Sequence, residues 1–167
     1  MKKIKGFTLI ELLIVIAIIA ALSALAFVAL NPLARFQDSR NAQRWNDVKI
    51  IAEAIKLQQI DNQGVYDDAI LDLTERLVYQ IGEDDAGNCG DTCLYPTVDL
   101  EDDCVDLDSY LSADYLQEIP IDPNDPDADY NETRYYLIKN ENDTITVGVC
   151  SEELGSNEAV PEIMVTR

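Results

Sequence analysis

Residues 7–30 read FTLIELLIVIAIIAALSALAFVAL, an apolar run of 24 residues in which only Thr8, Glu11 and Ser23 are polar. A helix of this length rises about 36 Å, and the hydrocarbon core of a bilayer is roughly 30 Å thick. A secretory signal peptide would have a shorter apolar stretch of about 7 to 15 residues, so we expect no cleavage after this run. The run therefore predicts a membrane-spanning helix.

Charge is distributed very unevenly along the 167-residue chain. Lys2, Lys3 and Lys5 precede the apolar run, which predicts a cytoplasmic N-terminus and export of everything that follows. From Asn62 onward 4 basic residues face 27 acidic ones, so this part carries a charge of 4 − 27 = −23. Such a surface repels phosphate backbones, so we expect no nucleic-acid binding by it. Histidine, the commonest general base, is absent from the sequence, which argues against an enzyme.

Glu11 is the one charged residue inside the apolar run. A carboxylate at the centre of a bilayer costs about 2.5 to 3.5 kcal/mol on insertion scales. A buried carboxylate and a buried ammonium are each costly alone and tolerable as a pair. We therefore expect Glu11 to meet a positive partner when copies of the chain pack together; a simple signal anchor with an incidental glutamate is the alternative.

Residues 5–12, Lys-Gly-Phe-Thr-Leu-Ile-Glu-Leu, resemble the processing signature of type IV pilins and type II secretion pseudopilins. The resemblance implies that a prepilin peptidase cuts between Gly6 and Phe7 and methylates the new amino terminus. It also implies that Glu11 neutralises the N-terminal ammonium of a neighbouring subunit. The implied partners are identical or homologous pilin subunits, the peptidase, an inner-membrane assembly platform and an assembly ATPase.

Beyond the apolar run the sequence predicts a second helical segment and then a small head. Asn31-Pro32 should interrupt the helix, because proline removes a hydrogen bond and clashes with the preceding turn. Residues 31–61 are then expected to form an amphipathic helix under the head, with an apolar face of Phe36, Trp45, Val48, Ala52, Ile55 and Gln59 and an opposite face of Arg40, Arg44, Asp47, Lys49, Glu53 and Lys56.

The head, residues 62–167, is expected to be exported, acidic and mixed in structure. Helices are predicted over 69–81 and 112–118, the second capped by Ser112. The β-rich runs 133–139 and 144–150 predict a hairpin, and 163–166 a further strand. The expected fold class is α+β and pilin-like: a leader (1–6), a membrane or filament-core helix (7–30), the amphipathic helix (31–61) and a head with a small antiparallel sheet.

The four cysteines, Cys89, Cys93, Cys104 and Cys150, all lie in the exported part. An even number there favours two disulfides, with three possible connectivities. Our preferred pairing is Cys89 with Cys93 and Cys104 with Cys150. A zinc site is the weaker alternative, because the usual C-x2-C pairs are missing.

The segment 119–132 is rich in side-chain oxygens and prolines, as calcium loops are, and Ca²⁺ takes six to eight oxygen ligands. The segment Tyr115–Pro123 is also similar to one in major pseudopilins, where the loop that follows can bind a structural calcium. It departs from the usual pattern in having Asn124-Asp125 where Trp-Gly is common. The alternative is a solvated Asp/Pro turn. The candidate ligands for a structural calcium are Asp122, Asn124, Asp125, Asp127 and Asp129.

Together these features predict a structural subunit of a type IV pilus-like extracellular filament. It would be a single-pass membrane protein before assembly and part of a cell-surface filament afterwards. One alternative is a major pseudopilin-like subunit of a type II secretion system. Another is a membrane-anchored calcium-binding surface protein that does not polymerise.

Overall fold

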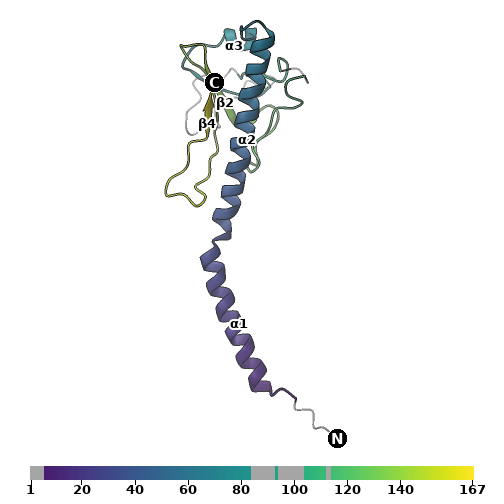
Figure 1. The fold of residues 1–167 in the computed structure, drawn as a ribbon, viewed down its shortest axis with the longest axis vertical. Coiled ribbons are helices and arrows are strands. Elements are labelled where there is room, and N and C mark those ends of the chain that lie inside the picture. Colours follow the sequence, from purple (N-terminus) through teal and green to yellow (C-terminus); the bar gives the residue numbers. More distant parts are fainter. Residues whose placement is uncertain (1–5, 84–92, 94–103, 112–113) are drawn as a thin grey trace.

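The computed structural model describes residues 6–83, 93, 104–111 and 114–167. A long bent helical stalk carries a small head, and α1 points away from that head (Figure 1). The stalk consists of α1 (Leu9–Leu30) and α2 (Pro32–Asp61). The head contains α3 (Asp68–Leu71) and the strands β1 (Val78–Gln80), β2 (Tyr135–Lys139), β3 (Ile145–Val149) and β4 (Met164–Thr166).

The bend in the stalk lies at Asn31, between α1 and α2 (Figure 1). Asn31 has a left-handed backbone conformation with φ 37°, and Pro32 is the first residue of α2. Proline suits the first position of a helix, where its missing N–H has no intrahelical partner, but it cannot continue a helix from the preceding turn. The predicted interruption at Asn31-Pro32 is confirmed.

The head is built on a four-stranded antiparallel sheet in the order β1-β2-β3-β4. The hairpin of β2 and β3 pairs Tyr135 with Val149 and Lys139 with Ile145. The predicted hairpin and C-terminal strand are therefore confirmed, and so is the α+β class with a small antiparallel sheet.

Both faces of the sheet are covered, because side chains of β2 alternate between two clusters. Tyr135 and Leu137 join the main core with Val48, Ile51 and Ile55 of α2. Tyr136 points into a second cluster that contains Val78, Cys93 and Cys150. Burying one such aliphatic side chain contributes about 1.5–3 kcal/mol, so the α2–sheet contact holds the head on the stalk.

Two helices predicted in the head are wrong. The predicted helix 69–81 is helical only over residues 69–71, which belong to α3, and residues 78–80 form β1 instead. Val78, Tyr79 and Ile81 are buried, and pairing with β2 overrides the local helical preference. In the described part of the second prediction, residues 114–118 form turns and bends and no helix; its expected cap, Ser112, lies outside the described residues.

The buried face of α2 also differs from the predicted face. Val48, Ala52 and Ile55 are buried as expected, but Phe36 is 64% exposed and Trp45 44% exposed. Arg44 and Asp47, expected on the outer face, are buried. The buried stripe follows residues 44, 48, 51 and 55, whose spacing of four, three and four keeps them on one side of a helix.

Candidate functional site

The apolar surface of α1 has no cover within the chain. None of its 22 residues is buried, and Glu11 is its only charged residue. By length and composition the stalk contains one helix able to cross a membrane, in the part of the chain that the structure describes. Apolar surface of this extent needs a lipid or protein environment, because exposing it to water is unfavourable.

Glu11 lies in the first turn of α1, where Thr8 is the N-cap. Its Oε2 accepts hydrogen bonds from the backbone N of Thr8 at 2.8 Å and from the Thr8 hydroxyl at 2.7 Å. The Thr8 hydroxyl in turn accepts from the backbone N of Glu11 at 3.3 Å. This capping box satisfies two N–H groups that the start of a helix leaves without partners.

Gly6 and Phe7 precede this cap in a segment without regular secondary structure. Both are exposed, and a Cβ placed on Gly6 would meet no atom within 4 Å. The peptide bond between them is therefore accessible, as the predicted cleavage requires. The cleavage itself stays a prediction.

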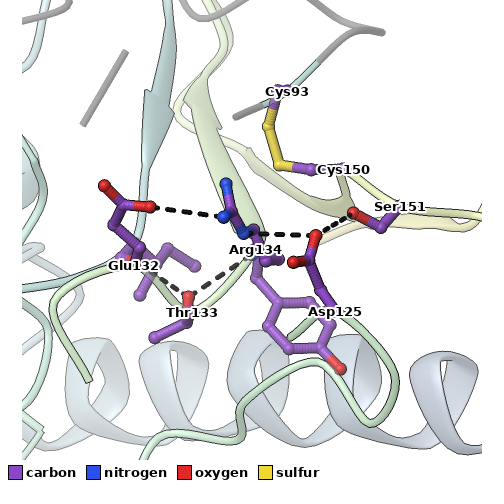
Figure 2. The surroundings of a disulfide bond; sticks show 9 residues. Cys93, Asp125, Glu132, Thr133, Arg134, Cys150 and Ser151 are labelled. Atoms are coloured by element: carbon purple, nitrogen blue, oxygen red, sulfur yellow. Dashed lines mark hydrogen bonds and ion pairs between the residues drawn. A yellow bond between two sulfur atoms is a disulfide. The ribbon is translucent and has the colours of Figure 1, made fainter. Parts of the chain in front are cut away.

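The expected pairing of the cysteines is wrong, because Cys150 is bonded to Cys93 and not to Cys104 (Figure 2). The bond ties the end of β3 to a residue 57 positions earlier in the chain. Cys104 is disulfide-bonded as well, and Cys89, the remaining cysteine of the sequence, lies outside the described residues. The sequence alone does not choose among the connectivities, because it does not show which cysteines the fold brings close together.

The five residues predicted to bind calcium differ in exposure, and the binding of calcium stays a prediction. Asp122 is buried and Asp125 half-buried, whereas Asn124, Asp127 and Asp129 are exposed. Among the described residues no group of three or more acidic, histidine or cysteine side chains is arranged to hold a metal ion. Two of the carboxylates cap local turns instead. Asp125 Oδ1 accepts a hydrogen bond from the backbone N of Asp127 at 3.1 Å, and Asp129 Oδ1 accepts one from the backbone N of Asn131 at 2.8 Å.

Sequence reasoning missed the group that binds Asp122, the guanidinium of Arg44. Its Nε lies 2.6 Å from Asp122 Oδ2 and its Nη2 2.9 Å from Oδ1, and both side chains are almost fully buried. Its Nη1 donates to Glu153, which also accepts two bonds from Arg40. Arg44 is spaced from Val48, Ile51 and Ile55 as a residue on the buried face of a helix would be. We predicted it on the outer face because it is charged.

Burial and the neighbouring charges shift the pKa values of three side chains that lie on or against α2. The hydrogen bonds from Arg40, supported by Arg44, hold the pKa of Glu153 below its ordinary value although burial opposes the shift. Burial raises the pKa of Asp47, and the hydrogen bond from the Tyr135 hydroxyl at 2.8 Å only partly offsets this. Burial, followed by the nearby Asp47 carboxylate, raises the pKa of Tyr135. Other residues line the two pockets found in the described part of the head.

Comparison with known proteins bears on the N-terminal part alone. The family described as "Prokaryotic N-terminal methylation motif" matches residues 1–27, which is the signature of type IV pilins and pseudopilins. A search of curated proteins and a search of solved structures found no match. The matched residues contain Gly6, Phe7, Thr8 and Glu11, and they indicate a structural subunit more than an enzyme.

Proposed function

We propose that this chain, whose N-terminus carries the type IV pilin and pseudopilin signature, is a structural subunit of a type IV pilus-like extracellular filament. The observation that carries the proposal is the coincidence of that signature with an uncovered apolar helix whose only charge is Glu11. The motif implies processing by a prepilin peptidase and assembly with other pilin subunits.

Before assembly, α1 lies in the membrane with its N-terminus in the cytoplasm and the acidic head outside. The length and composition of the helix fit such a span. In the filament, the α1 helices of many subunits pack against each other and the heads face outward. This packing covers the apolar surface that has no cover within one chain.

Cleavage between Gly6 and Phe7 would create a new ammonium group on Phe7, two residues before α1 begins at Leu9 and four residues before Glu11. A neighbour's ammonium can then meet the Glu11 carboxylate within the apolar bundle. Each ion alone would be costly there, and the pair is tolerable. This pair would also set the axial position of one subunit relative to the next, because the Glu11 carboxylate lies at a fixed place on α1.

The test replaces Glu11 in the native gene by glutamine, which keeps the shape and removes the charge. We expect the sheared filament fraction to fall about tenfold or more, since leaving one buried charge unpaired costs more than 1.4 kcal/mol. The precursor should still reach the membrane. Glu53→Gln on the exposed side of α2 is the matched control and should assemble normally.

Normal assembly of the Glu11→Gln subunit would contradict the proposed pairing. A wild-type chain that stays entirely in the membrane fraction of cells that make other pili would instead favour a non-polymerising anchored protein.

A major pseudopilin-like role is the second candidate, favoured by the sequence segment Tyr115–Pro123. Deleting the gene distinguishes the two functions. Loss of surface filaments supports the pilus-like role, and loss of secreted proteins with intact surface filaments supports the secretion role.

A further inference from the structure

Asp122 is the first acidic residue of the 119–132 segment, and both oxygens of its carboxylate accept hydrogen bonds from protein donors. Oδ1 accepts from Arg44 Nη2 at 2.9 Å and from the backbone N of Asn124 and Asp125 at 2.9 and 3.0 Å. Oδ2 accepts from Arg44 Nε at 2.6 Å. Three of these bonds converge on Oδ1, and the fourth takes one of the two lone-pair directions of Oδ2, so donors of the protein already bind both oxygens.

The same guanidinium joins a second segment to the first. Arg44 Nη1 donates to Glu153 Oε2 and to Asn41 Oδ1, both at 2.9 Å. Arg40 completes the group with bonds of 2.6 and 2.5 Å to the Glu153 carboxylate. Two guanidinium groups thus face two carboxylates, and the charges of the groups that these bonds join balance.

A second buried arginine, Arg134, lies beside two other carboxylates of the segment (Figure 2). Arg134 is 5% exposed, and its Nε lies 3.3 Å from Asp125 Oδ2 while its Nη2 lies 3.4 Å from Glu132 Oε2. Asp125 Oδ2 also accepts from the Ser151 hydroxyl at 3.1 Å. Arg134 has φ 67°, a left-handed conformation that is costly for a residue with a side chain.

These contacts do not fit a calcium site. Calcium needs six to eight oxygens around one point, and the carboxylates of Asp122 and Asp125 are turned toward arginines. A cation placed beside Asp122 would also be repelled by the buried guanidinium that already lies there.

We propose that the guanidinium groups of Arg44 and Arg134 hold the 119–132 segment where a divalent cation would otherwise hold it, so that the head folds and stays folded without calcium. Arg44 connects α2, the 119–132 segment and the loop between β3 and β4 in one buried cluster. The disulfide Cys93–Cys150 fixes the end of β3 close to Arg134 (Figure 2). The proposal concerns the head alone and does not depend on filament assembly.

Thermal unfolding of the purified full chain in detergent micelles tests this, with Trp45, the only tryptophan and next to Arg44, as the fluorescent reporter. We expect the same Tm in excess chelator and in millimolar calcium. A site saturated with calcium at 100 times its Kd would raise Tm by about 10 °C or more. A rise of that size in the wild type would overturn the proposal.

The variants test the arginines directly. Arg44→Gln should lower Tm by about 10 °C or more, because it leaves buried carboxylates without their partner. Arg134→Gln should act in the same direction and serves if the first variant does not accumulate. Arg76→Gln is the matched control: it removes a 2.8 Å ion pair with Glu141 whose side chains are 71% and 58% exposed, and it should shift Tm by no more than about 5 °C. A Tm unchanged in both test variants would also overturn the proposal.

Discussion

Thr8 and Glu11 cap the first turn of α1 reciprocally, with the Glu11 carboxylate accepting from both the backbone N and the hydroxyl of Thr8. Glu11 therefore has partners on its own chain before any neighbour reaches it. These hydrogen bonds from Thr8 reduce the free-energy cost of holding the Glu11 carboxylate in an apolar segment. In the proposed filament, a neighbour's ammonium would replace or add to a partner that Glu11 already has.

Replacing Thr8 by valine should loosen the start of α1. Loss of an N-cap costs about 1 kcal/mol, which corresponds to about fivefold faster amide exchange in the first turn. Hydrogen exchange of the full chain in micelles measures this, and Thr8→Ser, which keeps the hydroxyl, is the control. Equal exchange in all three chains would show that the cap does not hold the helix.

Peptide mapping of the unreduced protein should recover Cys93 linked to Cys150 and Cys89 linked to Cys104. Asp91 lies between Cys89 and Cys93, and the acidic residues 99–103 precede Cys104, so cleavage at aspartate separates all four cysteines. Closing the 57-residue separation is worth about 4 kcal/mol in the chain-entropy model, so Cys93→Ser with Cys150→Ser should lower stability by an amount of that order. Linked peptides of Cys89–Cys93 and Cys104–Cys150 would contradict the disulfide between Cys93 and Cys150.

Gly148→Ala should destabilise the head by about 1–3 kcal/mol, because overpacking a buried site forces its neighbours to move. Gly148 pairs with Tyr136 across β2 and β3, and an added Cβ would lie 2.2 Å from Cζ of that ring. Denaturant unfolding of the single variant and of the Tyr136→Leu background measures the coupling. The alanine should cost clearly less once the ring is gone, and equal costs would exclude the ring as the cause.

Glu153 should make the unfolding free energy of the head depend on pH, in a direction that its pKa shift defines. Its pKa in the folded head is lowered by Arg40, so its contribution is present above the ordinary glutamate pKa of about 4.3 and is lost as pH falls through the folded value. Glu153→Gln should therefore cost about 2 kcal/mol at pH 7 and progressively less below pH of about 4. Unfolding free energies of both chains across this range measure the difference.

The control for this series is Glu141→Gln, which removes an exposed ion pair with Arg76. Its cost should stay below about 1 kcal/mol at every pH. A Glu153→Gln cost that does not change with pH would show that the charge of Glu153 is unimportant.

The sequence predicted those parts of the molecule that local chemistry decides. The apolar run, the break at Asn31-Pro32 and the β2–β3 hairpin each follow from residues close together in the chain. The N-terminal signature lies within a dozen residues and needs no knowledge of the fold.

The features that the sequence did not predict depend on contacts between residues far apart in the chain. β1 is a strand because β2 lies beside it, and the fold brings Cys93 to Cys150 although 57 positions separate them in the sequence. Arg44 can be buried only because Asp122 and Glu153, 78 and 109 residues away, neutralise it. A charge on a helix looks solvated until its partner is known.

The most direct test of the filament account is the intact mass of the chain recovered from its native cells. The account predicts a protein that has lost residues 1–6 and begins at an N-methylated Phe7. A protein that still begins at Met1, in cells where other prepilins are processed, would contradict it.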